Sequence, residues 1–273
     1  MKTVTSADGT KIAYDQTGAG PVVVLVSGAF NTRSFGPNES LAPVLAKDFT
    51  VINYDRRGRG ESSNVLPYSV AREVEDLAAL IKSSGGKVSL YGISSGAALA
   101  LEAANMLSGI EKVALFEAPF VVDGSRTPIP TNFAEHLNAL VKSGRSSEAI
   151  KYFMTKGVGL PGIFVMMMRL MPAWKQLKAA APTAPYDAQT LHSNGSGRPL
   201  DGAQWQHVTM PTLVMSGGKS PKWMQHAMPA LAQALPNAMH RTLPGQIHIV
   251  KAEAIAPIIT QFFKGELADD QKK

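Results

Sequence analysis

The 273-residue sequence contains no cysteine. This absence excludes disulfide bonds, a thiolate nucleophile and metal sites that depend on cysteine ligands. The sequence also lacks any apolar run that approaches the ~20 residues of a membrane-spanning helix. Residues 1–8 are largely polar and do not contain the hydrophobic centre of a secretion signal. We therefore expect a cytoplasmic protein without a membrane partner.

Clustered charge is also scarce. Lysine and arginine outnumber aspartate and glutamate by 27 to 21, which gives a formal net charge of +6, but the cations are spread along the chain. The one tight cluster contains Arg56, Arg57 and Arg59, and it has Asp55 and Glu61 beside it. Such a stretch is typical of a solvated or ion-paired loop rather than of a nucleic-acid-binding face. We expect no nucleic-acid partner.

What the sequence does contain is a regular alternation of short apolar stretches with helical stretches. The strand-like stretches comprise residues 21–26, 50–54, 87–91, 112–116, 211–216 and 239–243. The first of them, 21–26, is apolar on both faces, as is typical of a strand buried inside a parallel sheet. Between them, residues 69–83 and 97–107 have the composition and spacing of helices. This alternation predicts an α/β fold with a doubly wound, mostly parallel sheet.

The alternation lapses between residues 122 and 207, where the pattern is helical or irregular. We therefore predict a core formed by residues 1–121 and 208–273, with a helical cap at 122–207 inserted between two late strands. An insertion at that point would cover the edge of the sheet where the carboxyl ends of the strands lie. Open α/β sheets bind their ligands at this edge.

Ser94 occupies the centre of the stretch Gly-Ile-Ser-Ser-Gly at residues 92–96, between a predicted strand and a predicted helix. Small residues two before and two after the serine allow the backbone to bend sharply. The hydroxyl then stands clear of the sheet, above the N-terminus of the helix. This pattern is a G-x-S-x-G nucleophile elbow and predicts Ser94 as the nucleophile.

Four motifs, in this order, resemble those of the α/β-hydrolase family with a helical cap. They are the loop at 27–30, the Asp-Arg-Arg-Gly-Arg-Gly-Glu-Ser stretch at 55–62, the elbow at 92–96 and the loop at 243–248. The resemblance extends from about Thr3 to Phe263 and implies the α/β-hydrolase fold. For the stretch at 55–62 we expect a structural role, in which Asp55 and the arginines brace the turn beneath the elbow.

The resemblance also implies how Ser94 is activated. A serine hydroxyl is a poor nucleophile at neutral pH and needs a base within hydrogen-bond reach. His248 follows the last predicted strand, where family members keep this base. By motif match, the backbone N–H groups of Ala29 and Ser95 form the oxyanion hole. Ser27 stands where most of the family has a histidine, but that position shapes the loop and is not required to donate a hydrogen bond.

The acid of the triad departs from the commonest family pattern. The strand at 211–216 is followed by a loop that contains Lys219 and no carboxylate. A lysine there would oppose the imidazolium that forms during attack. Cap-bearing relatives such as the haloalkane dehalogenases place the acid after the preceding strand, where this chain has Glu117. The resemblance therefore points to Glu117, with Asp123 as the next candidate. Alternatively, Glu117 braces the entrance of the cap or pairs with a loop arginine.

The predicted cap is rich in methionine. Flexible thioethers suit a pocket for varied hydrophobic groups, but they are equally suited to packing the cap against the sheet. Both interpretations stay open from the sequence. The methionines concerned are Met154, Met166, Met167, Met168 and Met171.

Together these residues predict a serine hydrolase that cleaves carboxylic esters, or related lactones and thioesters, through an acyl-enzyme on Ser94. The expected partner is a small apolar ester-like substrate, and the reaction needs neither a metal nor an organic cofactor. The alternative is a ligand-binding or receptor-like protein of this fold with little turnover. Perhydrolases, C–C bond hydrolases and hydroxynitrile lyases share the serine and histidine on this fold and also stay open. The sequence specifies neither the exact substrate nor the oligomeric state.

Overall fold

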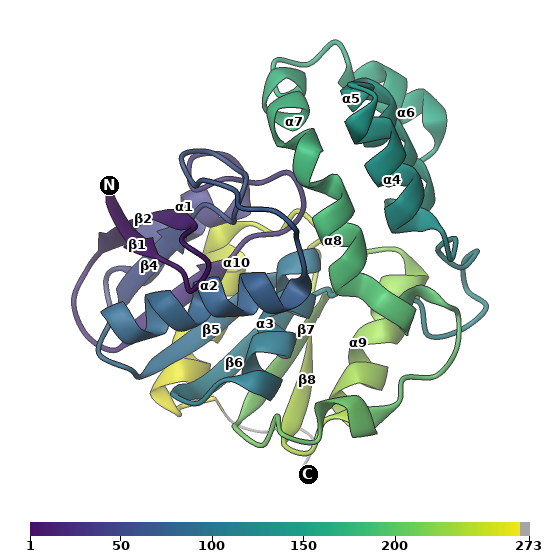
Figure 1. The fold of residues 1–273 in the computed structure, drawn as a ribbon. Coiled ribbons are helices and arrows are strands. Elements are labelled where there is room, and N and C mark those ends of the chain that lie inside the picture. The colour runs from purple at the N-terminus through teal and green to yellow at the C-terminus, as the bar shows by residue number, and fades with distance from the viewer. Residues whose placement is uncertain (268–273) are drawn as a thin grey trace.

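The computed structural model describes residues 1–267, apart from the side chains of residues 192 and 193. An eight-stranded sheet runs through its centre in the order β1-β2-β4-β3-β5-β6-β7-β8 (Figure 1). The pairs β1–β2 and β2–β4 are antiparallel and all the others are parallel. The strands are β1 (Lys2–Thr5), β2 (Lys11–Thr17), β3 (Val22–Val26), β4 (Thr50–Tyr54), β5 (Val88–Ile93), β6 (Ile110–Phe116), β7 (Thr212–Gly217) and β8 (Ala238–Leu243). This topology confirms the predicted fold class.

Helices cover both faces of the sheet, because its central strands are apolar on both sides and need a partner on each. Helices α2, α3 and α9 share one apolar core with the sheet, and α1 and α10 share another. In Figure 1, α2 and α3 cross in front of the sheet and α10 lies behind it. These helices are α1 (Pro37–Leu45), α2 (Val70–Ser83), α3 (Ser95–Met106), α9 (Lys222–Ala234) and α10 (Ala252–Lys264). No helix within residues 1–267 has the length and apolarity needed to cross a membrane.

Helix α10 begins five residues earlier than its composition suggests. Proline favours the first turn of a helix, so the sequence indicates a start at Pro257. In the structure Pro257 lies inside the helix. Ile255 and Ala256 are buried against the same core as Ile259. The burial of this extra turn offsets the one backbone hydrogen bond that a proline cannot donate.

All the helices between β6 and β7 lie within residues 122–207, and we call this segment the insertion. Helices α4 to α7 lie together at one end of the molecule, and α8 leads from them towards the sheet (Figure 1). The helices are α4 (Phe133–Lys142), α5 (Ser146–Tyr152), the π-helix η1 (Phe153–Val158), α6 (Gly162–Met168), α7 (Trp174–Ala180) and α8 (Ala184–Leu191), with short 3-10 turns at Ala181–Thr183, His192–Gly195 and Gly202–Trp205. Residues 268–273 of the predicted core segment lie outside the described residues.

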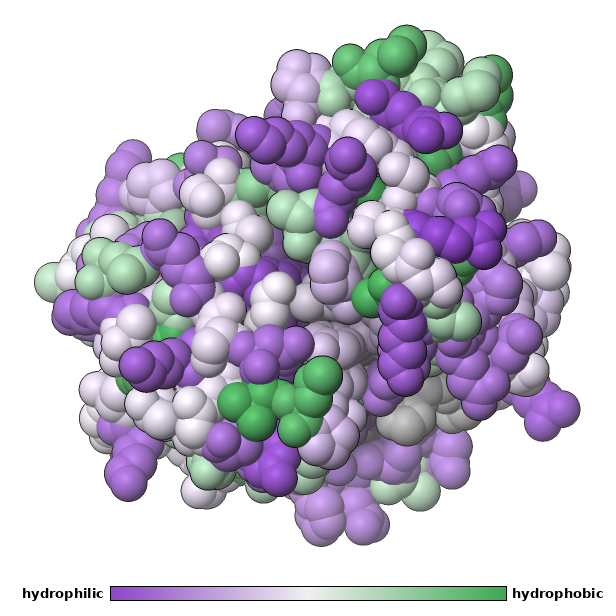
Figure 2. Space-filling view, turned by 45° about the horizontal axis from the view of Figure 1, so that its top comes forward, coloured by the Kyte–Doolittle hydropathy of each residue, from purple (hydrophilic) through white to green (hydrophobic). Residues whose placement is uncertain are grey.

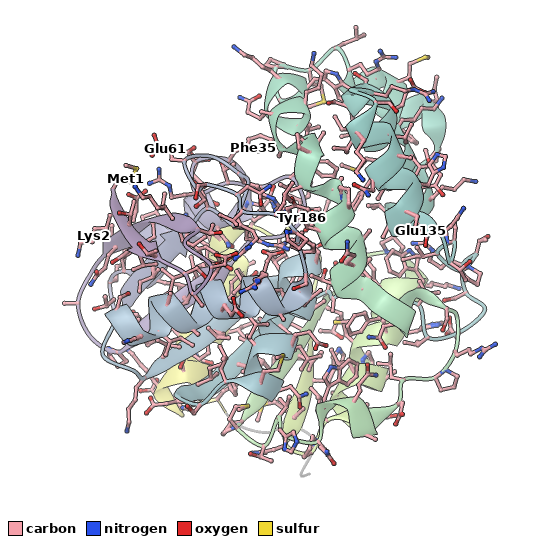
Figure 3. All side chains as sticks on the ribbon, viewed as in Figure 1. Met1, Lys2, Phe35, Glu61, Glu135 and Tyr186 are labelled. Atoms are coloured by element: carbon pink, nitrogen blue, oxygen red, sulfur yellow. The ribbon has the colours of Figure 1, made fainter. Side chains whose placement is uncertain are left out.

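Aromatic contacts join the insertion to the rest of the chain. Phe153 packs edge-to-face on Phe30, with ring centroids 5.0 Å apart. Tyr186 of α8 stacks on Tyr68 at a centroid distance of 3.7 Å, and it lies where the insertion meets the core (Figure 3). The first contact holds the insertion beside the loop that follows β3, and the second holds it beside the segment between β4 and α2.

Candidate active site

Ser94 occupies a sharp turn between β5 and α3. Its φ of 57° and ψ of −130° are rare for a residue with a side chain, and such a conformation costs about 1–3 kcal/mol. Glycine is required on either side because the backbone is crowded. A Cβ at Gly92 would lie 2.5 Å from the carbonyl oxygen of Gly96, and a Cβ at Gly96 would lie 2.3 Å from that of Val26. The elbow pattern therefore reflects close packing of the turn against β3 and α3.

His248 and Glu117 meet at the carboxyl edge of the sheet. His248 lies in the loop after β8, and Glu117 directly follows β6. The distance between His248 Nδ1 and Glu117 Oε2 is 2.8 Å. The second carboxylate oxygen of Glu117 accepts a hydrogen bond of 2.7 Å from the N–H of Gly217, and the Glu117 side chain is fully buried. Glu117 therefore contacts the histidine and the end of β7, not a loop arginine.

The two other residues considered for this position lie elsewhere. Asp123 contacts His226 Nδ1 at 2.7 Å, and both side chains are exposed. Lys219 contributes its backbone N–H, which donates to the carbonyl of Gln246 and ties the loop after β7 to the loop of His248. At the end of β7 itself, a Cβ on Gly217 would lie 2.6 Å from the carbonyl oxygen of Gln246. A side chain there would push away the loop that carries the histidine.

Ala29 and Ser95 lie at the two backbone positions expected for an oxyanion hole. Ser95 is the first residue of α3, and Ala29 follows the end of β3 by three residues. Within residues 1–267, neither backbone N–H donates to a protein acceptor. A Cβ on Gly28 would lie 3.0 Å from the Cβ of Ser94, so the loop after β3 packs directly beside the elbow. Both N–H groups are thus free to bind a ligand.

Ser94 and His248 line a common cavity of about 20 Å³, which has room for about one water molecule. Apart from His248, its lining carries no ionisable side chain. The remaining lining residues are Ser95, Pro119, Phe153, Gly157, Val158, Leu191 and Met224. The insertion contributes four of them. The described residues contain no group of three histidine, aspartate or glutamate side chains that could hold a metal ion.

None of these five methionines lines this cavity, so the pocket interpretation is wrong for the site of Ser94. Met166, Met167 and Met171 are more than half exposed. Met154 and Met168 are partly buried against the apolar core of the insertion, whereas the packing interpretation placed them against the sheet. The short helix α6 buries Val165 and turns most of its methionines outward. The methionine of the cavity is Met224 of α9.

This arrangement agrees with a known family, because the profile of the alpha/beta hydrolase family matches residues 23–252. The chain belongs to the alpha/beta hydrolase family. The match contains the elbow, His248 and Glu117, and it confirms the resemblance seen in the sequence motifs.

Solved structures of this fold resemble this alpha/beta hydrolase along nearly all of its length. An alpha/beta hydrolase from Sphaerobacter thermophilus DSM 20745 is 46% identical with a TM-score of 0.89, and the match covers 96% of this chain and 100% of that one. A thermophilic esterase from Thermogutta terrifontis is 21% identical with a TM-score of 0.68, and the match covers 98% and 99% of the two chains. The second likeness concerns the fold alone.

A shorter match links part of this alpha/beta hydrolase to a hydrolase of a dienoic acid, by that protein's name. It is 32% identical over 100 residues to the 2-hydroxy-6-oxo-6-(2'-aminophenyl)hexa-2,4-dienoic acid hydrolase of Metapseudomonas resinovorans. The match covers 35% of this chain and 34% of that relative, about a third of each.

Asp187 of α8 is a residue of this site that motif reasoning missed. Its buried carboxylate accepts hydrogen bonds from Arg56 Nη1 at 2.7 Å, Arg59 Nη2 at 2.5 Å and the hydroxyl of Ser95 at 2.8 Å. Burial opposes its charged form, but the guanidinium groups of Arg59 and Arg56 hold the pKa of Asp187 below its ordinary value. One feature of the sequence could have indicated this residue: Asp187 is the first carboxylate after Glu148.

The same two arginines hold the loop that carries Ala29. Arg59 Nη1 donates to the carbonyl of Gly28 at 2.7 Å, and Arg56 Nη1 donates to that of Ser27 at 3.2 Å. The loop at 55–62 is ion-paired, as expected, but its arginines do more than brace the turn beneath the elbow. It joins the insertion, through Asp187, to the loop beside Ser94.

We predict that Asp187→Asn lowers the free energy of unfolding by about 3 kcal/mol or more, because two buried guanidinium groups lose their shared anion. Urea unfolding measures this loss. Asp123→Asn is the matched control and should cost less than about 1 kcal/mol, since the pair of Asp123 with His226 is exposed. Equal losses in the two variants would contradict the role of Asp187.

Proposed function

We propose that this alpha/beta hydrolase cleaves small, neutral carboxylic esters through an acyl-enzyme on Ser94. The observation that carries the proposal is the 2.8 Å contact between Glu117 Oε2 and His248 Nδ1, on a histidine that shares a cavity with Ser94. A carboxylate at this nitrogen holds the imidazole in the tautomer whose other nitrogen can accept a proton. The alternative of a binding protein rested on the lack of an acid beside His248, and the contact with Glu117 argues against that alternative.

In the proposed acylation step, His248 Nε2 takes the proton of the Ser94 hydroxyl as Oγ attacks the ester carbonyl. Glu117 stabilises the imidazolium that forms, and the N–H groups of Ala29 and Ser95 donate to the oxyanion. The imidazolium then returns its proton to the departing alcohol. A water molecule reverses the sequence and releases the carboxylic acid. No step requires a metal ion or an organic cofactor.

The lining of the cavity supports an apolar, uncharged acyl group. Burying a charged group among Pro119, Phe153 and Met224 would cost its hydration without a compensating partner. We infer that the insertion acts as a cap over this cavity, because Phe153, Gly157, Val158 and Leu191 form much of its wall. A cavity of about 20 Å³ admits a substrate when these cap residues move apart.

C–C bond hydrolysis is the second candidate. The 32% identical match over 100 residues is to a hydrolase of a dienoic acid, by that protein's name. Such a substrate carries a carboxylate, and among the side chains of the catalytic cavity there is no lysine or arginine to receive it. The charge of the preferred substrate therefore separates the two candidates.

The test combines a fluorophosphonate label with a panel of nitrophenyl esters. We predict that the label attaches to Ser94 and that short, neutral acyl esters have a kcat/KM at least ~10-fold above that of esters with a carboxylate on the acyl chain. Mass spectrometry of the labelled peptide identifies the serine. A folded protein that resists the label would overturn the acyl-enzyme, and a preference for charged substrates would favour C–C bond hydrolysis.

A further inference from the structure

Apolar side chains gather on the outer surface of the insertion around α6. Seven of the twelve residues from 160 to 171 are large apolar residues with exposures between 36% and 88%. Figure 2 shows hydrophobic residues gathered at the top of that view, at the end of the molecule where α5 and α6 lie in Figure 1. We call these residues the α6 patch: Leu160, Ile163, Phe164, Met166, Met167, Leu170 and Met171. Single exposed apolar residues are ordinary, but a contiguous group marks an interaction surface.

The segment that carries the α6 patch is positively charged. Residues 149–186 contain five cations and no carboxylate, whereas the whole chain has 27 cations and 21 carboxylates. All five cations are exposed, and none forms an ion pair within the described part of the chain. They are Lys151, Lys156, Arg169, Lys175 and Lys178. A partner of this surface must therefore offer both apolar groups and negative charge.

A groove of about 630 Å³ lies between α6 and the helices α4 and α5. Its lining combines apolar side chains such as Ile163 and Met166 with three cations and one carboxylate, which are Arg145, Lys151, Arg169 and Glu148. This volume is in the range that holds a small organic ligand. The groove thus has apolar surface and a net positive charge, as the α6 patch and its segment do.

We propose that the α6 patch docks this hydrolase on an anionic lipid surface. Exposed Phe, Leu, Ile and Met side chains enter the boundary between headgroups and acyl chains, and lysine or arginine side chains nearby are attracted to the anionic headgroups. A second copy of the chain fits less well, because a symmetric contact between two patches would bring two sets of five cations together. The expectation of no membrane partner rested on the lack of a spanning segment, which surface docking does not need.

The docking surface adjoins the catalytic cavity. Phe153, Gly157 and Val158 of η1 line the cavity, whereas Thr155 of the same helix and the preceding Tyr152 line the groove. The helix η1 therefore contributes side chains to both the catalytic cavity and the groove. Docking depends on the α6 patch and the cations of its segment, so the proposal does not rest on the reaction assigned to Ser94.

Co-sedimentation with lipid vesicles tests the proposal, with Met167→Asp as the variant and Met106→Asp as its control. Both methionines are 58% exposed, but Met106 lies at the end of α3, outside the patch. We expect the wild-type protein and Met106→Asp to sediment with vesicles of phosphatidylglycerol and phosphatidylcholine, and to bind far less to phosphatidylcholine alone or in high salt. Met167→Asp should bind at least ~10-fold more weakly. Circular dichroism melting shows that each variant is folded.

Four results would overturn the proposal. The wild-type protein could fail to bind the anionic vesicles, or bind neutral vesicles equally well. Met167→Asp, folded, could bind as tightly as Met106→Asp. Light scattering could show a dimer that Met167→Asp alone dissociates, which would assign the α6 patch to a second copy of the chain.

Discussion

Ser94→Ala is expected to lower ester turnover by a factor of about 10⁴ or more, because no other group can take the acyl chain. The substitution removes one oxygen and keeps the Cβ, so the strained turn and the close contacts of Gly92 and Gly96 are preserved. His248→Ala should have a comparable effect, and the double variant should be little worse than either, since the two side chains act as a unit. Initial rates with a short nitrophenyl ester measure all three variants.

His226→Ala is the matched control for the histidine. Like His248, His226 contacts a carboxylate: its Nδ1 lies 2.7 Å from Asp123 Oδ2. Both of these side chains are exposed, and His226 does not line the cavity of Ser94. Its removal should leave turnover within a small factor of the wild-type value. If Ser94→Ala kept more than about a tenth of the wild-type activity, the acyl-enzyme mechanism would have to be abandoned.

Glu117→Gln is expected to lower kcat by a factor of about 10³ to 10⁴, by analogy with the acid of other triads. The amide has nearly the same size, and its oxygen can still accept the hydrogen bond from the N–H of Gly217. It lacks the charge that stabilises the imidazolium and favours the productive tautomer of His248. Measurements of kcat and of the rate of fluorophosphonate labelling should both show the loss.

Two controls accompany Glu117→Gln. Asp123→Asn changes a carboxylate that contacts a different histidine, and Lys219→Ala removes a side chain from the loop after β7. Both should leave kcat nearly unchanged. Equal rates for Glu117→Gln and the wild type would show that the carboxylate has only a structural role. The binding-protein interpretation would then be favoured.

Backbone strain in the described chain gathers around this site. Phe30, Ser94 and Glu117 are the three non-glycine residues with positive φ within residues 1–267. One follows Ala29, one is the proposed nucleophile and one is the proposed acid. Positive φ costs free energy for residues with a side chain, so the surrounding packing has to hold them in place. The buried ion pairs of Arg56 and Arg59 with Asp187 supply part of that support.

The sequence by itself predicted the sheet and the elbow, and the family resemblance pointed to a contact between His248 and Glu117. Each of these depends on local pattern or on a general rule. Buried parallel strands are apolar on both faces, a tight strand-to-helix turn needs glycine, and parallel strands bring their carboxyl ends to one edge. Glu117 and His248 are 131 positions apart in the chain, yet each directly follows a strand or its short loop. Their positions could therefore be inferred before their contact was known.

Tertiary structure alone decided the partners of the buried arginines and the direction of the methionines. Arg56 and Asp187 are also 131 positions apart, but Asp187 lies on a helix of the insertion whose orientation no local pattern specifies. The methionines of α6 were expected in a pocket or in a core, and most of them face solvent. Periodicity shows which residues share a face of a helix, whereas the packing of the whole insertion determines what that face meets.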